Sequence, residues 1–121
     1  MVKINNEIPL IIIDWARSIS LRNPIKMASF YRDDAILVGT YSKPMEYGIR
    51  EITKYFEDFL DVKSISCTIL ENTNQNYGDT TVSNGVYQFV LNGQKVLARY
   101  TYVIKLTNNR MRILTHHSSE L

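Results

Sequence analysis

The chain has 121 residues, of which 45% are hydrophobic and 21% are charged, and its formal net charge is +2. This length is enough for one domain, which we expect to span residues 1–121. The 14 basic and 12 acidic residues are evenly spread. That distribution argues against a nucleic-acid partner, because nucleic acids bind to a concentrated basic face.

The sequence also gives no sign of export or of membrane insertion. The apolar run Pro9–Ile13 is too short for a signal peptide, and no stretch reaches the roughly 20 apolar residues of a membrane helix. Cys67 is the single cysteine, so it has no internal disulfide partner, which is typical of reducing compartments. We therefore expect a soluble, cytoplasmic protein with no membrane partner.

Helices are predicted at the start of the chain. Over residues 7–22 the apolar side chains recur at the spacing of one helix face. These side chains are Ile8, Ile11, Ile12, Trp15 and Ile19. The Asn23–Pro24 pair then predicts an N-cap and the first residue of a second helix, roughly residues 24–32, which the Asp33–Asp34 pair should end.

The middle of the chain should contain a short strand, a loop and a third helix. Residues 35–38 are all apolar and predict a buried strand. Residues 39–48 combine turn formers with apolar side chains such as Tyr41, a composition that suits a loop covering a cavity. Residues 49–62 keep one apolar face and predict the clearest helix of the chain, with Gly48 as its N-cap.

Strands dominate the second half of the chain. The expected strands cover residues 64–70, 80–91, 95–107 and 110–118. The polar residues 72–76 predict a turn after the first of them. The Asn92–Gly93 and Asn108–Asn109 pairs should form the tight turns between the later strands, since Asn and Gly tolerate positive φ.

The order of these elements predicts an α+β domain. The helices come first and four strands follow as a meander, so the helices should lie on one face of a strongly curved antiparallel sheet. A bent sheet wrapped around a long helix forms a cone with an open mouth, which is a natural pocket for a small molecule.

His116 and His117 are the two histidines of the chain. Neighbours in a strand point to opposite faces, so the two rings are poorly placed to bind one metal ion together. We therefore predict no metal site, and no cofactor motif is present. One histidine should face the cone as a hydrogen-bonding group or, alternatively, as an acid or base. The sequence leaves open which of the two it is.

Aromatic side chains are the other candidates for the cone interior. Tyr100 and Tyr102 share one face of their predicted strand, and Arg99 lies on the other face. The two tyrosines either pack in the core with bonded hydroxyl groups or line a ligand pocket. Trp15 belongs to the apolar stripe of the first helix, and Asp14 beside it is a candidate for the cavity rim.

The chain resembles the nuclear-transport-factor-2-like superfamily in four segments. They are residues 22–35, 48–60, 98–103 and 112–119. They contain an Asn-Pro helix start, a Tyr-Arg-Asp-Asp-Ala exit, a Tyr-Phe-Glu helix and a terminal His-His-Ser-Ser. This ordered set is similar to the association (hub) domain of calcium/calmodulin-dependent kinase II and to bacterial SgcJ/EcaC-like and SnoaL-like relatives. The resemblance implies a cystatin-like cone.

The resemblance also suggests which residues line the cavity. The hub domain places arginines where this chain has Tyr87, Tyr102 and Ser118, so its carboxylate-binding role is not implied here. Kinase activity is not implied either, because no kinase motif is present. The expected ligand-binding residues are Trp15, Tyr41, Tyr87, Tyr100, Tyr102, His116 and Ser118.

Three functional hypotheses follow from this resemblance and these residues. The first is a stand-alone association-domain-like protein that forms a homodimer or a larger ring and binds a small, largely apolar molecule in the cone. The second is a small enzyme, either an isomerase, cyclase, dehydratase or hydrolase, that uses a cavity His, Asp or Tyr. The third is a protein-interaction adaptor.

Overall fold

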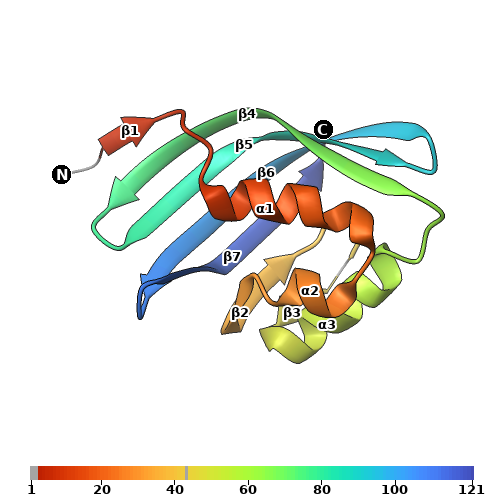
Figure 1. The fold of residues 1–121 in the computed structure, drawn as a ribbon, viewed down its shortest axis with the longest axis horizontal. Coiled ribbons are helices and arrows are strands. Elements are labelled where there is room, and N and C mark those ends of the chain that lie inside the picture. The colour runs from red at the N-terminus through yellow and green to blue at the C-terminus, as the bar shows by residue number, and fades with distance from the viewer. Residues whose placement is uncertain (1–2, 43) are drawn as a thin grey trace.

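One curved sheet contains the seven strands that the structure describes, and the helices lie against one of its faces (Figure 1). The computed structural model describes residues 3–42 and 44–121. Within these residues, no helix is long and apolar enough to cross a membrane. The hydrophobic core lies between the helices and the inner face of the sheet.

The sheet combines antiparallel neighbours with one parallel pair. The strands are β1 (Lys3–Asn5), β2 (Tyr31–Val38), β3 (Glu46–Tyr47), β4 (Ile65–Tyr77), β5 (Thr80–Leu91), β6 (Gln94–Thr107) and β7 (Arg110–Glu120). The helices are α1 (Leu10–Ser18), α2 (Pro24–Ala28) and α3 (Gly48–Phe59), with a 3₁₀ turn at Ile19–Leu21. The strand order is β1-β4-β5-β6-β7-β2-β3, and β2 runs parallel to β7. The predicted α+β class, with a curved sheet around N-terminal helices, is confirmed.

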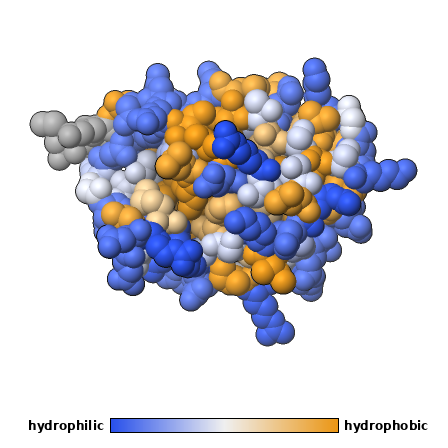
Figure 2. Space-filling view, viewed as in Figure 1, coloured by the Kyte–Doolittle hydropathy of each residue, from blue (hydrophilic) through white to orange (hydrophobic). Residues whose placement is uncertain are grey.

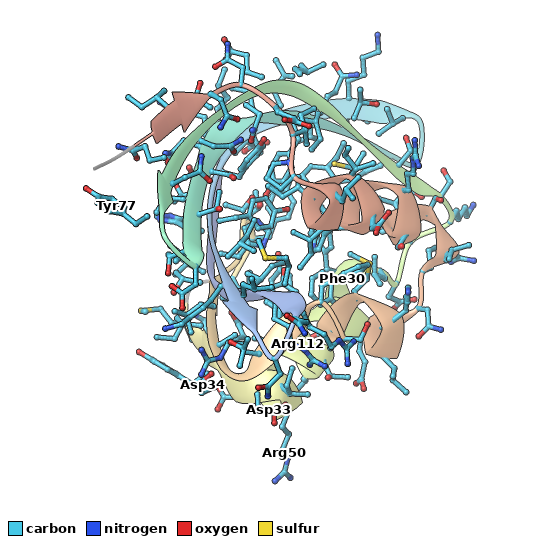
Figure 3. All side chains as sticks on the ribbon, turned by 60° about the vertical axis from the view of Figure 1, so that its left-hand side comes forward. Phe30, Asp33, Asp34, Arg50, Tyr77 and Arg112 are labelled. Atoms are coloured by element: carbon cyan, nitrogen blue, oxygen red, sulfur yellow. The ribbon has the colours of Figure 1, made fainter. Side chains whose placement is uncertain are left out.

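The second helix is shorter than the sequence predicted. Asn23 caps it as expected, because its side chain accepts a hydrogen bond from the Lys26 amide at 3.1 Å. The helix has only five residues, however, and Tyr31 already belongs to β2. The prediction that Asp33 and Asp34 end this helix was wrong, because both lie within β2 with exposed side chains that Figure 3 shows at the periphery.

Pairing with β7 explains why the helix stops early. The Phe30 carbonyl accepts a hydrogen bond from the Ile113 amide at 2.8 Å, and β2 then runs beside β7. A helix over residues 24–32 would lose this pairing. The long-range strand contact therefore overrides the local helix preference.

The asparagine-rich end of β4 is strand and not the predicted turn at residues 72–76. Asn72 and Asn74 point inward and are 8% and 4% exposed. The Asn72 side-chain amide donates to the Asn74 side-chain oxygen at 2.8 Å, and the Asn74 amide donates to Asn5 of β1 at 2.9 Å. Bonded amides thus replace apolar side chains on this part of the inner face. Hydrophobic periodicity cannot detect such a strand, and β1, which pairs with it, was missed for the same reason.

Two tight turns join β5, β6 and β7 as predicted. Asn92 and Gly93 have φ angles of 50° and 84°. Asn108 and Asn109 have φ angles of 51° and 61°. Positive φ at both central residues matches the twist of the flanking strands.

Asn92 also links the β5–β6 hairpin to the residues just before β4 through hydrogen bonds. Its side-chain oxygen accepts hydrogen bonds from the amides of Lys63 at 2.8 Å and Ser64 at 3.1 Å. The Asn92 amide in turn donates to the Ser64 carbonyl at 3.0 Å. One residue therefore holds the connection between α3 and the sheet.

We expect Asn92→Ala to destabilise the protein more than Asn108→Ala. Each variant loses a residue that tolerates positive φ, at a cost of about 1 kcal/mol. Asn92→Ala also loses two hydrogen bonds, which adds about 0.5–1.5 kcal/mol for each, whereas the Asn108 side chain has no such bond within the described residues. Urea unfolding of both variants measures the difference, and equal losses would contradict this role of Asn92.

Candidate functional site

His116 and His117 point to opposite faces of β7. His116 faces the interior and is 2% exposed, whereas His117 is exposed on the other side. The Tyr31 hydroxyl lies 2.8 Å from His116 Nδ1, and the Tyr87 hydroxyl lies 3.1 Å from Nε2. Both ring nitrogens are therefore hydrogen-bonded, one to a tyrosine of β2 and the other to a tyrosine of β5.

The hydrogen bonds continue beyond the two tyrosines. On one side, Trp15 Nε1 of α1 donates to the Tyr31 hydroxyl oxygen at 3.1 Å. On the other side, the Tyr87 hydroxyl donates to Ser118 Oγ, which is bonded to Thr40 Oγ1. The resulting chain connects α1, β2, β5 and β7 through the interior.

One tautomer of a neutral His116 satisfies this chain. Because the Tyr87 hydroxyl donates to Ser118, its oxygen accepts from His116 Nε2–H, and Nδ1 then accepts from Tyr31. Burial lowers the pKa of His116 from 6.5 to about 3, and the charge of His117 adds to the effect. His116 is therefore uncharged at neutral pH.

Aromatic rings surround His116. The Tyr102 ring stacks on it with centroids 3.9 Å apart and 15° between the planes, and Trp15 meets it edge-on at 5.4 Å. Tyr100 packs beside Tyr102 at 5.0 Å and crosses over Gly85, where a Cβ atom would lie 2.5 Å from the Tyr100 hydroxyl oxygen. Only glycine at position 85 leaves room for this ring.

The buried phenols and the thiol stay protonated. Burial raises the pKa of Tyr31, Tyr87 and Tyr102 well above the ordinary value. It also raises the pKa of the Cys67 thiol to about 12, as expected for an unreactive cysteine. The Tyr102 hydroxyl is buried without a hydrogen-bond partner among the described residues. The interior thus combines polar groups with no net charge.

Little space remains inside the cone, but a large hollow lies at its mouth. The space beside Trp15 and His116 measures about 10 Å³, close to what one water molecule needs. The mouth hollow measures about 670 Å³. It is lined by Tyr41, Glu46, Lys54, Tyr55, Asp58 and Phe59, among others. Tyr55 and Phe59 of α3 border both spaces.

The structure separates the seven predicted ligand-binding residues into two groups. Six meet in the interior, namely Trp15, Tyr87, Tyr100, Tyr102, His116 and Ser118. Tyr41 is 54% exposed and lines the mouth hollow, where its ring packs against Phe59 with centroids 6.3 Å apart. Asp14 is exposed on α1 and lines a different depression, so it does not join His116.

The sequence did not single out Tyr31 or Tyr55 as site residues. Tyr31 was assigned to a helix, so its inward position in a strand was hidden. Tyr55 lies four residues before Phe59 on α3, a spacing that places both rings on one helix face. Gly39 is a sequence feature connected with Tyr55: a glycine allows close approach of a neighbouring side chain, and a Cβ atom at position 39 would lie 2.2 Å from the Tyr55 ring.

The fold and its packed interior define the class of protein. An NTF2-like protein of unknown function from Pseudomonas putida has a TM-score of 0.81 at 15% identity, over 91% of this chain and 81% of that chain. A putative dehydratase from the NTF2-like family of Streptomyces avermitilis has a TM-score of 0.82 at 14% identity, over 93% and 91%. These likenesses show that the chain has the NTF2-like, cystatin-like fold.

Closer similarity identifies the family. The family model of the calcium/calmodulin dependent protein kinase II association domain matches residues 5–121. A putative association domain of this kind from Xanthomonas campestris is 34% identical, with a TM-score of 0.84 over 91% of this chain and 82% of that chain. The chain therefore belongs to the calcium/calmodulin dependent protein kinase II association domain family, which confirms the predicted resemblance. None of the curated proteins matches it.

His116 should make the fold sensitive to mild acid. In the unfolded chain a histidine binds a proton near pH ~6.5, whereas the folded protein keeps His116 neutral down to about pH 3. Between these two pH values the unfolded state binds more protons than the folded state. The free energy of unfolding is therefore highest above pH ~6.5 and falls as the pH decreases, by up to about 1.4 kcal/mol per pH unit. Urea unfolding from about pH 7 to about pH 5 should show a steeper loss for the wild type than for His116→Gln.

The neighbouring histidine provides the matched control. His117 is exposed, so His117→Gln should keep the wild-type slope of stability against pH. A His116→Gln variant with the wild-type slope would show that His116 is not held neutral in the folded protein.

Proposed function

We propose that this protein is an association module that assembles with copies of itself through the outer face of its sheet. The outer face consists of the side chains on β4–β7 that point away from the helices. They include Val82, Val86, Val90, Leu97, Thr101, Val103 and Thr115. Such apolar and β-branched side chains form a surface that a second sheet can cover. Membership of an association-domain family supports the same function.

One row of side chains across the outer face carries this proposal. Glu71 of β4 is in register with Val86 of β5, and Val86 is in register with Arg99 of β6. All three line one hollow of the outer face, and the two charged side chains are exposed. The row therefore runs from acidic through apolar to basic.

This order suits a two-fold axis that runs along β5 between two facing sheets. Such an axis places Glu71 of one copy opposite Arg99 of the other, with the two Val86 side chains between these pairs. An axis perpendicular to the strands would place like charges opposite each other. The row of charges thus favours the two-fold axis along β5 over the axis perpendicular to the strands.

Sedimentation velocity at several concentrations tests the assembly. The wild type should sediment as a dimer or a larger species, and Val86→Lys should shift it towards the monomer, because the new charge lies at the centre of the interface. Ile25→Lys is the matched control, since Ile25 is 75% exposed on α2, on the helical side of the sheet (Figure 1). A wild type that remains monomeric at all concentrations would overturn the proposal.

Exchanging the charges tests the axis within the same experiment. Glu71→Arg and Arg99→Glu should each weaken the assembly, because each creates like-charged neighbours across the interface. The combined variant should restore it. If the combined variant assembles no better than the single ones, the axis along β5 is excluded even though assembly itself stands.

We also propose that a small, largely apolar molecule binds at the mouth of the cone. The mouth hollow, at about 670 Å³, is within the usual size range of ligand pockets. Its wall of Tyr55 and Phe59 backs onto the interior cluster that contains Trp15 and His116. In this arrangement Tyr41 contacts the ligand directly, and the interior residues support the wall.

A neutral fluorescent probe, 1-naphthalenemethanol, tests the ligand proposal. The wild type should bind it, and Tyr41→Ser should weaken binding several-fold, because the Tyr41 ring lines the hollow. Tyr47→Ser is the control, since Tyr47 is 57% exposed and is not among the residues that line the hollow. Equal losses in both variants would count against binding at the mouth.

The enzyme and adaptor hypotheses have less support from the molecule. Both nitrogens of His116 are bonded and its pKa is lowered to about 3, so its imidazole is a weak base at neutral pH. On the side that carries α1 and α2, apolar areas are interrupted by polar ones (Figure 2). That surface is less suited to a broad apolar contact than the outer face of the sheet.

A further inference from the structure

Among the described residues, the charged side chains that line the mouth hollow are mostly acidic. Glu46, Glu51 and Asp58 line it, together with Lys54. The whole protein has a net charge of +2, so this group opposes the overall sign. A concave surface lined by one sign of charge concentrates the opposite ion.

Glu46 is the buried member of this group. It is 9% exposed and lies in β3 opposite the core residue Leu37 of β2, so its side chain is on the inner side of the sheet. Its Oε1 accepts a hydrogen bond from the Ser42 hydroxyl at 2.6 Å. Its Oε2 is buried and has no hydrogen-bond partner within the described residues. An unpartnered buried carboxylate oxygen is costly, and a bound cation would supply the missing partner.

Aromatic rings complete the wall around this carboxylate. The Tyr55 and Phe59 rings stack with centroids 5.6 Å apart and 18° between the planes. Tyr41 packs against Phe59 from the exposed side. The face of an aromatic ring attracts an ammonium group, and the attraction increases where water is excluded.

Carboxylates add to the effect of burial on the pKa of the two tyrosines in this wall. Burial raises the pKa of Tyr55, and the charge of Glu46 raises it further. Burial also raises the pKa of Tyr41, with a contribution from the charge of Glu120. Carboxylates thus act on both rings, and the same field favours a cation placed between them.

We propose that the mouth hollow binds an organic cation, an ammonium group carried on an apolar body. The ammonium group pairs with Glu46 and lies against the rings of Tyr41 and Tyr55, and the apolar body contacts Phe59. This inference rests on the proposed binding of a small apolar ligand at the mouth and adds the charge of that ligand.

Three naphthalene probes that differ in charge test the inference by isothermal titration calorimetry. They are 1-naphthylmethylammonium, 1-naphthalenemethanol and 1-naphthoate. The wild type should bind the ammonium probe about tenfold more tightly than the alcohol, and the naphthoate most weakly. Glu46→Gln should reduce the affinity for the ammonium probe to that for the alcohol, because the amide keeps the size and the bond to Ser42 but loses the charge.

Glu57→Gln is the matched control, since Glu57 is exposed on α3 and is not among the residues that line the hollow. It should keep the wild-type preference. Equal binding of ammonium and alcohol by the wild type would overturn the cation site and leave the ligand proposal intact. Absence of binding by all three probes would overturn both.

A further variant examines the lysine that is close to Glu46 in the sequence. Lys43 follows Ser42 and precedes Glu46 in the same segment, and it lies outside the described residues. Lys43→Ala should bind the ammonium probe at least as tightly as the wild type. A wild-type preference for naphthoate that disappears in Lys43→Ala would show that this lysine neutralises Glu46, and would overturn the inference.

Discussion

The imidazole of His116 has a bonded partner on each nitrogen, and the interior is arranged around that requirement. Tyr31 brings β2 to the ring, Tyr87 brings β5, and Trp15 adds α1 through Tyr31. A buried imidazole without these partners would be strongly unfavourable, whereas a fully satisfied network makes the packing specific. Phe56 of α3 contacts both Trp15 and Tyr31. The helix that forms the wall of the mouth hollow is thus supported by the same cluster.

The proposed assembly surface and the proposed ligand site use different residues. The outer face presents side chains of β4–β7 that point away from the helices, and the mouth hollow is formed mainly by α3 and the segment that contains Tyr41. A ligand at the mouth therefore does not compete with a second sheet for contacts. Tyr77, at the end of β4, is in register with Thr80 and lies on the outer-face side of the sheet, and it projects away from the body of the molecule in Figure 3.

The sequence was sufficient for those parts of the fold that local patterns determine. Alternating apolar residues and the Asn92 and Asn108 turns located β5, β6 and β7, because turn chemistry and pleat act over a few residues. The start of β2 was not predictable in this way, since Tyr31 and its partner His116 are 85 residues apart. The amide-bearing end of β4 was missed because burial there depends on hydrogen bonds and not on hydropathy.

The site likewise has a part that local sequence patterns predict and a part that depends on contacts distant in sequence. Strand parity predicted that one histidine faces inward, but the choice of His116 depends on the register with β6, which shifts at a bulge beyond Val103. The sequence put Trp15, Tyr87, Tyr100 and Tyr102 in one group, and they are neighbours in the interior, whereas Tyr41 of the same group lies at the mouth. It could not show that these rings fill the cone, because the free volume depends on how all the side chains pack together. The open space is consequently at the mouth.

The place of β7 in the sheet has a consequence for biosynthesis. β7 lies between β6 and β2, although it follows every other strand along the chain. A ribosome releases Trp15 and Tyr31 long before residues 110–120. Tyr31 therefore lacks its hydrogen-bond partner His116 while most of the chain is made. Until then β2 has no neighbour that joins it to the main sheet, and nucleation depends on contacts distant in sequence. Until β7 is made, the nascent chain therefore lacks part of the packing around these aromatic rings, a state in which exposed apolar surface favours aggregation.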